Sequence, residues 1–216
     1  MKYKNILFDL DGTLVKSERG IFNSIRHALK EDSLENISDE DLLPFIGPPL
    51  IDSFQKQFGF DEEKAMEIVN KYRAHYTKIG LFENEIYEGI GDLLLELHKN
   101  CRLFVVTTKP QPFAEKILDH YNFKKLFDRI YGPSFDGKYN DKKELMKFAL
   151  EESNLNPSEC LMIGDRFYDM EAAKVNDVDA LGVLYGYGDE EELLENGAKD
   201  LVSTAEEILK YIKNKK

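Results

Sequence analysis

Acidic and polar side chains directly follow three short apolar segments of this 216-residue chain. The segments and the groups that follow them are Lys4–Phe8 with Asp9, Asp11 and Thr13, then Leu103–Val106 with Thr107 and Lys109, and then Leu161–Ile163 with Asp165 and Asp169. If the segments are strands of one parallel sheet, the groups that follow them meet at the sheet edge where ligands bind. The spacing therefore predicts one site that contains carboxylates, hydroxyl groups and a lysine.

The carboxylates of this predicted site require a cation. Asp9 follows Ile6-Leu7-Phe8, and an unpaired carboxylate at the end of a buried strand is costly. Asp9, Asp11 and Asp165 would repel one another unless a cation held them together. Hard oxygen ligands suit Mg²⁺, which takes one or two carboxylates together with phosphate oxygens. A zinc site is not expected, because the histidines are scattered over predicted helices: His27, His75, His98 and His120.

The elements that must position these groups alternate along the chain. The expected strands are short, continuously apolar segments: Lys4–Phe8, Leu103–Val106, Leu161–Ile163, Leu181–Leu184 and, more weakly, Leu201–Val202. The expected helices lie between them: Asp92–Lys99, Pro112–Tyr121, Asp141–Glu152, Asp169–Asn176 and Thr204–Ile212. This alternation predicts the α/β class, with a doubly wound, Rossmann-like parallel sheet.

The stretch from Ser17 to Phe82 interrupts this alternation with helical spacing and almost no strand signal. Its apolar stripes are Ile21, Phe22, Ile25, Ala28 and Leu29, then Leu50, Ile51, Phe54 and Phe58, and then Ala65, Met66, Ile68, Val69, Tyr72 and Tyr76. Ser38, followed by acidic residues, predicts a helix start, and Gly47-Pro48-Pro49 predicts a break. We therefore expect a Rossmann-like core of residues 1–16 and 83–216 that carries an all-helical insertion, residues 17–82.

Composition excludes several classes of partner. A net charge of −12 and a pI near 4.9 argue against a nucleic-acid polymer, because affinity for a polyanion comes from clustered Lys and Arg. No apolar run approaches the roughly 18–20 residues that a membrane span needs. Cys101 and Cys160 each border a predicted strand, which favours two small core residues over a disulfide or a metal pair. A cytoplasmic protein, either a monomer or a weak homodimer, is expected.

Four motifs in this chain, in this order, resemble those of the haloacid dehalogenase-like hydrolase superfamily. Asp9-Leu10-Asp11-Gly12-Thr13-Leu14-Val15 is similar to its first motif, Thr107 to its second, Lys142 to its third, and Gly164-Asp165-Arg166-Phe167-Tyr168-Asp169 to its fourth. The resemblance covers essentially the whole chain, and the inserted helices resemble the helical cap of that superfamily. It implies a Mg²⁺-dependent phosphatase that passes through a phosphorylated aspartate.

The resemblance also implies roles for the acidic groups. Asp9 is expected to be the nucleophile, and Asp11 the general acid for the leaving group and general base for the water. The carboxylates of Asp9 and Asp165 and the backbone carbonyl of Asp11 are expected to hold Mg²⁺. The supporting residues are expected to be Gly12, which permits a sharp exit from the strand, Thr13, which holds the loop by a hydrogen bond, and Asp169, which acts through water or another indirect contact.

Phosphoryl transfer depends chiefly on positioning and on charge neutralisation. Thr107 and Thr108 are expected to hold phosphate oxygens through a hydroxyl group and backbone N–H groups. From the residues alone, the neutralising lysine is one of four: Lys109, Lys138, Lys142 and Lys143. The resemblance favours Lys142, at the start of a helix.

Three further segments resemble the phosphoglycolate phosphatase-like branch, which includes members described as 5′-nucleotidases: Ile46–Leu50, Phe135–Lys138 and Leu184–Gly188. The expected substrate is a small phosphorylated metabolite, phosphoglycolate first and a nucleoside monophosphate as the alternative. The residues expected to influence this choice are Lys16, Arg26, Gly47 and Pro48. The sequence departs from the pattern of the family it resembles at Lys16-Ser17, where Asp often precedes Ser, and at Thr108, where Asn is frequent.

Three other functions are compatible with parts of this pattern. A phosphomutase would use the same four motifs and return the phosphate to a sugar instead of to water. A phospho-receiver module also carries an Asp, a Thr and a Lys on its sheet, but it would lack the position of Asp11 and the helical insertion. A catalytically silent binding protein is disfavoured because the motifs are intact.

Overall fold

The computed structural model describes residues 2–34, 36–135 and 138–215 of the chain. Contacts divide the chain into two compact units: Met1–Val15 with Ile86–Lys216, here named the sheet unit, and Lys16–Glu85, here named the helical unit. The assignment of residues 1–16 and 83–216 to a catalytic core, and of residues 17–82 to a cap, concerns function and remains a prediction.

Six parallel strands form the sheet, in the spatial order β5-β4-β1-β6-β7-β8. Their bounds are β1 Asn5–Phe8, β4 Arg102–Val106, β5 Arg129–Tyr131, β6 Cys160–Gly164, β7 Asp179–Val183 and β8 Asp200–Val202. In the middle of the sheet, Leu7 of β1 lies opposite Phe104 of β4 and Met162 of β6. All four residues of β1 are buried, as the continuous apolar run predicts.

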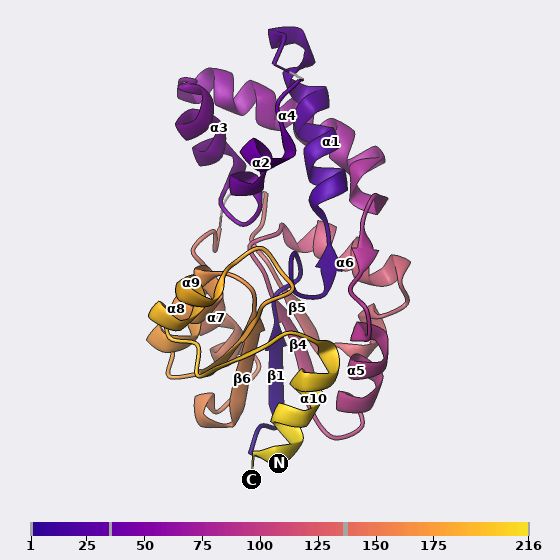
Figure 1. The fold of residues 1–216 in the computed structure, drawn as a ribbon, viewed down its shortest axis with the longest axis vertical. Helices are drawn as coiled ribbons and strands as arrows, with labels where there is room; N and C mark the ends of the chain where they lie inside the picture. Colours follow the sequence, from indigo (N-terminus) through magenta and orange to yellow (C-terminus); the bar gives the residue numbers. More distant parts are fainter. Residues whose placement is uncertain (1, 35, 136–137, 216) are drawn as a thin grey trace. The chain divides into compact units, whose positions relative to one another are not determined.

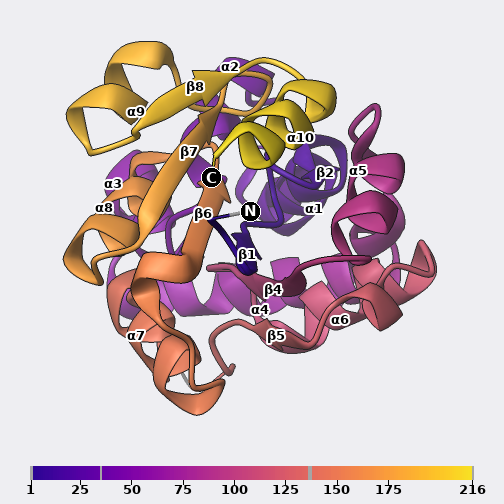
Figure 2. The same ribbon diagram turned by 90° about the horizontal axis from the view of Figure 1, so that it is seen from below.

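Helices cover both faces of this sheet (Figures 1 and 2). Their bounds are α5 Ile90–Leu97, α6 Gln111–His120, α7 Lys142–Glu152, α8 Phe167–Val175, α9 Glu190–Glu195 and α10 Ala205–Asn214, with short 3₁₀ turns at Lys124–Leu126 and Pro157–Glu159. Helix α7 packs against α8 on one face, and α10 packs against α5 on the other (Figure 2). The predicted doubly wound α/β architecture is confirmed. Among the described residues, no helix has the length and apolar character needed to cross a membrane.

Two elements of the sheet unit were not predicted, and one predicted strand ends too late. Strand β5 has only three residues, of which two are apolar, and α9 is mostly glutamate, so neither shows a clear hydrophobic period. The strand expected at Leu181–Leu184 is β7, which ends at Val183. Leu184 still donates its N–H to the carbonyl oxygen of Val202 in β8, but it lies in a turn and its side chain is exposed. Cys101 and Cys160 are free and buried, as expected.

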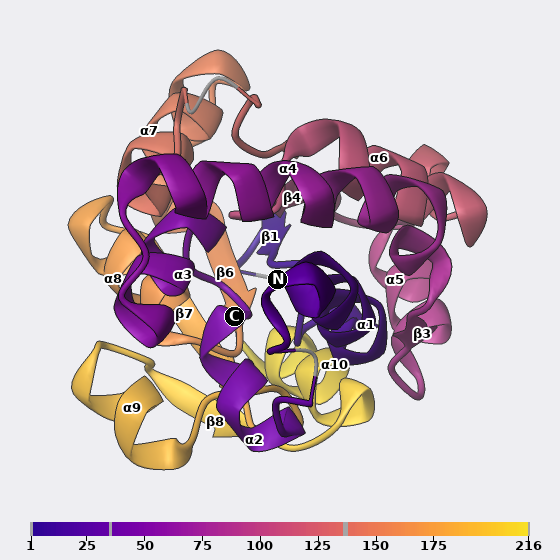
Figure 3. The same ribbon diagram turned by 90° about the horizontal axis from the view of Figure 1, so that it is seen from above.

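The helical unit contains α1 Glu18–Leu29, α2 Asp39–Leu42, α3 Leu50–Phe58 and α4 Glu62–Lys78, with 3₁₀ turns at Lys30–Asp32, Leu43–Phe45 and Gly80–Phe82. Helix α4 packs against both α1 and α3 (Figure 3). The chain passes between the units in β2, Val15–Lys16, and β3, Glu85–Ile86, which pair with each other. Ser38 caps α2 by accepting the N–H of Asp41, as the sequence predicts.

The apolar stripes predicted for these helices form most of the core of the helical unit. The stripe of α1 is buried throughout, and α4 buries Ala65, Ile68, Val69, Tyr72 and Tyr76. The inclusion of Met66 was wrong, because this side chain is 41% exposed. Met66 follows Ala65 by one residue, which turns it roughly 100° away from the buried face of the helix.

Two of the four histidines, which were expected to be scattered, lie against each other. His27 of α1 and His75 of α4 stack with ring centroids 4.2 Å apart, and Nδ1 of His75 lies 3.0 Å from the Ser24 hydroxyl oxygen. The Ser24 hydroxyl donates to the carbonyl oxygen of Gly20, so its oxygen accepts from His75. Burial lowers the pKa of His75 below its ordinary value of 6.5, and His27 lowers it further, while Glu83 acts in the opposite direction.

This lowered pKa predicts that acid destabilises the helical unit. The unfolded chain takes up a proton near pH 6.5, whereas folded His75 does so only at lower pH, so the stability that His75 contributes is present above pH 6.5 and lost as the pH falls. We expect His75→Asn to weaken the fall in urea midpoint between pH 7.5 and pH 5.5, and His98→Gln, at an exposed position, to leave it unchanged. An identical pH dependence in wild type and His75→Asn would contradict this prediction.

Candidate active site

The first motif forms a tight loop at the end of the central strand β1. The N–H of Asp9 donates to the carbonyl oxygen of Ile163, so Asp9 still lies within the sheet, and it is only 6% exposed. Gly12 has a φ of +82°, a conformation that favours glycine, and Val15 closes the loop by donating to Leu10. The predicted role of Gly12, a sharp exit from the strand, agrees with this geometry.

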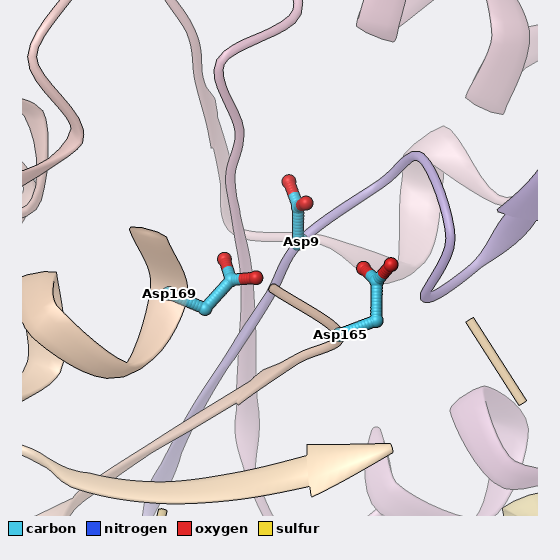
Figure 4. Close-up of side chains that lie close together, drawn as sticks. All are labelled: Asp9, Asp165 and Asp169. Atoms are coloured by element: carbon cyan, nitrogen blue, oxygen red, sulfur yellow. The ribbon is translucent and has the colours of Figure 1, made fainter. Parts of the chain in front are cut away.

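Three buried carboxylates gather at this edge of the sheet (Figure 4). They belong to Asp9 at the end of β1, Asp165 directly after β6, and Asp169 in the first turn of α8, and each offers an oxygen within 4.8 Å of the others. Asp165 and Asp169 are completely buried. The parallel strands therefore bring together residues that are far apart in the sequence, as the sequence predicted.

Lys142 lies beside this cluster. Its ammonium group is 2.9 Å from Oδ1 of Asp9 and 2.5 Å from Oδ1 of Asp169. Asp141, the residue before it, caps α7 by accepting the N–H of Lys143, which fixes where the helix begins. Burial by itself lowers the pKa of Lys142, but the carboxylates of Asp169 and Asp9 outweigh burial and hold this pKa above its ordinary value. Lys142 is therefore charged at neutral pH.

One lysine does not neutralise the cluster. Burial raises the pKa of Asp165 well above its ordinary value, and the charges of Asp169 and Asp9 raise it further. Burial also raises the pKa of Asp169, and so does Asp9, and although Lys142 opposes them the value reaches about 6. The excess negative charge, buried from water, suits a divalent cation, and a ligand set that contains only oxygen suits Mg²⁺.

Thr13 holds one of these carboxylates in place. Its hydroxyl group donates to Oδ1 of Asp165 over 2.9 Å, and both side chains are buried. The sequence predicted a hydrogen bond that holds the loop, and the bond joins the first motif to the fourth. The carboxylate of Asp169 also accepts the backbone N–H of Arg166, which fixes the first turn of α8.

Asp11 forms an ion pair with Lys109, with Nζ of Lys109 2.7 Å from Oδ2 of Asp11. Lys109 is 7% exposed and follows β4 by three residues. The other carboxylate oxygen of Asp11, Oδ1, is buried and has no hydrogen-bond partner among the residues that the structure describes. Lys109 thus fixes one oxygen of Asp11 and leaves the second for a ligand.

The hydroxyl hydrogen of Thr107, but not its backbone N–H, remains available for another partner. The N–H donates to the carbonyl oxygen of Tyr131 in β5 and so belongs to the sheet. The Thr107 hydroxyl oxygen accepts the N–H of Lys109 over 3.2 Å, so the hydroxyl hydrogen can donate to another group. Thr108, the next residue, is half-buried.

A family model described as haloacid dehalogenase-like hydrolase matches residues 6–183. The chain belongs to the haloacid dehalogenase-like hydrolases. The hydrolase is 43% identical over 194 residues to a 5′-nucleotidase of Pseudomonas aeruginosa, across 89% of this chain and 88% of that one. It is 26% identical over 217 residues to a phosphoglycolate phosphatase of Colwellia psychrerythraea, across 96% of each chain. A crystal structure of a predicted phosphatase from Clostridium acetobutylicum matches it with a TM-score of 0.93 at 39% identity, over 99% of both chains.

These likenesses confirm the family that the four motifs predicted, and they make this hydrolase an enzyme of the phosphatase type. Phosphatases of this family generally use a metal ion, and the buried acidic cluster is a group of carboxylates that could hold one. Small phosphorylated compounds are the substrates that this family implies.

The four candidate lysines differ in burial and in their partners. Lys138 is exposed, and Lys143 is half-buried and pairs with Glu171. Lys109 pairs with Asp11, and Lys142 is the candidate lysine that contacts Asp9 and Asp169, so the geometry favours Lys142. Asp136 and Gly137, from the Phe135–Lys138 segment, fall outside the described residues.

The residues expected to set specificity belong to the helical unit: Lys16, Arg26, Gly47 and Pro48. The side chain of Arg26 donates to the carbonyl oxygen of Ile37 and pairs with Asp39, so its contacts hold the helical unit together. Nζ of Lys16 lies 3.5 Å from Oε1 of Glu18. Their role in substrate choice remains a prediction.

Two contacts of this hydrolase's site were not predicted. Lys109 was considered only as a phosphate ligand, although its position two residues after Thr107 is a signal that it reaches the same edge of the sheet. The backbone N–H of Tyr187 donates to Oδ2 of Asp165 over 2.9 Å. Every residue except proline has a backbone N–H, so the residue type does not show which one will donate. The only sequence signal for this contact is the pair of glycines that flank Tyr187.

Proposed function

We propose that this hydrolase removes phosphate from small phosphomonoesters by transferring the phosphoryl group to Asp9. The observation that supports it is the placement of the Asp9 carboxylate at the end of β1, 2.9 Å from the buried ammonium group of Lys142 and within the acidic cluster. An oxygen of Asp9 attacks phosphorus, and the bond from phosphorus to the leaving oxygen breaks. Water then attacks the phosphorus of the aspartyl-phosphate, the bond to Asp9 breaks, and inorganic phosphate leaves.

Asp11 acts as general acid in the first step and as general base in the second. In the first step it donates a proton to the leaving oxygen, and in the second it removes one from the attacking water. Oδ1 of Asp11, the oxygen that Lys109 does not contact, is the atom suited to this transfer. The ion pair with Lys109 keeps the carboxylate from rotating away between the two steps.

The remaining residues bind and neutralise the phosphoryl group. Lys142 and the hydroxyl group of Thr107 offer donors to phosphate oxygens, and Thr108 directly follows Thr107 in the chain. Asp169 holds Lys142 toward Asp9 through its own contact with the ammonium group. This contact is direct, so Asp169 acts on the phosphate through Lys142.

The carboxylates of Asp9 and Asp165, with the backbone carbonyl of Asp11, are the groups that would hold Mg²⁺. When bound, the ion would neutralise charge on the transferring phosphoryl group. Thr13 keeps the Asp165 carboxylate turned into the site.

We expect Asp11→Asn to separate the two chemical steps. With p-nitrophenyl phosphate the leaving group departs without a proton, so the first step survives, whereas attack by water loses its base and steady-state turnover falls by about 10²–10⁴-fold. Stopped-flow absorbance should show a burst of p-nitrophenolate close to one equivalent of enzyme, and then a slow phase. Wild-type turnover in this variant, or slow turnover with no burst, would contradict the assigned role.

A nucleoside 5′-monophosphate is the substrate class that we propose. The sequence alone favoured phosphoglycolate as the substrate and kept a nucleoside monophosphate as the alternative. The 43% identity to a 5′-nucleotidase, against 26% to a phosphoglycolate phosphatase, supports the nucleoside monophosphate instead. Phosphoglycolate hydrolysis and a phosphomutase reaction remain outcomes that the following test distinguishes.

The test is a panel of substrates assayed with and without Mg²⁺. We expect kcat/KM for nucleoside 5′-monophosphates to exceed that for phosphoglycolate, sugar phosphates and pyrophosphate. We expect EDTA to abolish phosphate release from all of them and Mg²⁺ to restore it. A preference for phosphoglycolate would overturn the substrate class, transfer of phosphate between positions of a sugar would indicate a mutase, and full activity in EDTA would refute the cation site.

A further inference from the structure

The segment after β7 reads Tyr-Gly-Tyr-Gly, residues 185–188, and is here named the tyrosine–glycine loop. It belongs to the sheet unit, as does the acidic cluster. The chemistry proposed above uses none of its side chains. Each of its residues nevertheless lies against Asp165 or the loop of the first motif.

Two glycines bring the tyrosine–glycine loop into direct contact with the site. A Cβ atom on Gly186 would lie 2.3 Å from Cβ of Asp165 and 2.5 Å from the carbonyl oxygen of Gly12. A Cβ atom on Gly188 would lie 2.1 Å from the carbonyl oxygen of Asp165. Atoms do not pack this closely, so a larger residue at either position would force the loop or Asp165 to shift. The loop therefore rests on Asp165 and on the turn at Gly12.

The two tyrosines add hydrogen bonds to the same parts of the site. The N–H of Tyr187 donates to Oδ2 of Asp165, whose Oδ1 accepts the hydroxyl group of Thr13, so both oxygens of this carboxylate are held. The hydroxyl group of Tyr185 donates to the carbonyl oxygen of Thr13 over 3.0 Å, and its ring packs on Tyr87 with centroids 4.7 Å apart. Burial raises the pKa of Tyr185, and the nearby Asp165 raises it further, so the phenol stays protonated and able to donate.

We propose that the tyrosine–glycine loop positions the Asp165 carboxylate and the Gly12 turn, and thereby sets the affinity of the site for a divalent cation. The inference rests on the proposed function, because it takes the Asp165 carboxylate and the carbonyl of Asp11, which precedes Gly12, as cation ligands. A carboxylate held at both oxygens loses little freedom when a cation binds, so the loop lowers the cost of binding. None of its residues needs to touch the substrate or the cation.

The inference predicts weaker cation binding when the contact of the loop with Asp165 is disturbed. Gly186→Ala should raise the Kd for Mn²⁺, measured by electron paramagnetic resonance of the free ion without substrate, by roughly 10–100-fold. The same variant should lose much of the rise in melting temperature that Mg²⁺ gives the wild type. At saturating Mn²⁺ its KM for substrate should stay near the wild-type value, because the loop acts on the cation site.

Two further variants separate this role from a general loss of structure. Tyr185→Phe removes only the hydrogen bond to Thr13, keeps the ring and should raise the Kd for Mn²⁺ by less than Gly186→Ala does, which tests the inference even if Gly186→Ala fails to fold. Gly91→Ala, in helix α5, would meet only the ring of Phe123, at 3.2 Å, and should bind Mn²⁺ like the wild type.

The outcomes distinguish the loop from the proposed function. Wild-type Kd values for Mn²⁺ in both Gly186→Ala and Tyr185→Phe would overturn the role of the loop and leave the proposed phosphatase chemistry standing. Weakened Mn²⁺ binding in these variants, in a protein that hydrolyses no phosphomonoester, would support the loop and overturn the proposed function. A wild-type protein that binds no Mn²⁺ would overturn both.

Discussion

Replacing Asp9 by Asn is expected to lower kcat for phosphate release by about 10⁴-fold or more, as loss of a catalytic nucleophile does elsewhere. The amide has nearly the same shape and is a far weaker nucleophile, so attack on phosphorus stops while the surrounding packing is kept. The replacement also removes one of the charges beside Lys142. The measurement is release of inorganic phosphate from p-nitrophenyl phosphate and from a nucleoside 5′-monophosphate.

The matched control for this variant is Asp119→Asn, the same chemical change at an exposed position on helix α6. Asp119→Asn should keep wild-type kcat and KM, and circular dichroism should show both variants folded. A folded Asp9→Asn protein that retains more than a few per cent of wild-type kcat would remove Asp9 from the role of nucleophile.

The second large effect is expected from Lys142→Met. Lys142 is the buried ammonium group that contacts both Asp9 and Asp169, and methionine keeps much of its length without the charge. Breaking a buried ion pair from one side is strongly destabilising, so the free energy of unfolding should fall by about 3–5 kcal/mol in the presence of EDTA. Loss of a donor to the phosphoryl group should also lower kcat by about 10²–10³-fold.

The neighbouring residue supplies the control, because the side chain of Lys143 is 42% exposed and pairs with Glu171. Lys143→Met should change the free energy of unfolding by less than about 0.5 kcal/mol and leave kcat unchanged. Urea unfolding and steady-state kinetics on the two variants make the comparison. Equal effects at the two positions would mean that Lys142 has no special place in the site.

The strands that carry Asp9 and Asp165 could be predicted because they are buried on both faces. Lys4–Phe8 and Leu161–Ile163 are continuously apolar, and the structure places β1 and β6 there within a residue or two. The edge strand β5 is too short to give that signal, with three residues of which two are buried, and the acidic helix α9 buries only Leu193. The doubly wound parallel sheet was predicted from the alternation of strands and helices along the chain. That alternation does not depend on the exact residue at which each element begins or ends.

The acidic cluster could also be predicted, because residues after parallel strands must meet at one edge. Asp9 and Asp165 illustrate this: 156 residues apart in number (165 − 9), they each offer an oxygen within 4.8 Å of the other. Their partners were harder to predict. The pairing of Lys109 with Asp11 depends on the direction of a long, flexible side chain, and the bond from Tyr187 to Asp165 comes from a backbone N–H. Neither property is set by residue type and spacing.

The helical unit shows the same limit. Its apolar stripes gave the buried faces of α1 and α4, but sequence periodicity does not show which polar residues face one another across two helices. The stacked pair of His27 and His75 is an example, since the two residues lie on different helices and are 48 positions apart (75 − 27).

The central claim is that the Asp9 carboxylate accepts the phosphoryl group. A crystal structure of the enzyme with Mg²⁺ and beryllium fluoride tests this claim most directly. Beryllium fluoride mimics a phosphoryl group bonded to a carboxylate. The account predicts the fluoride complex on a carboxylate oxygen of Asp9, with Lys142 and Thr107 donating to it. A complex seated on any other side chain, with Asp9 left unmodified in the same crystal, would contradict it.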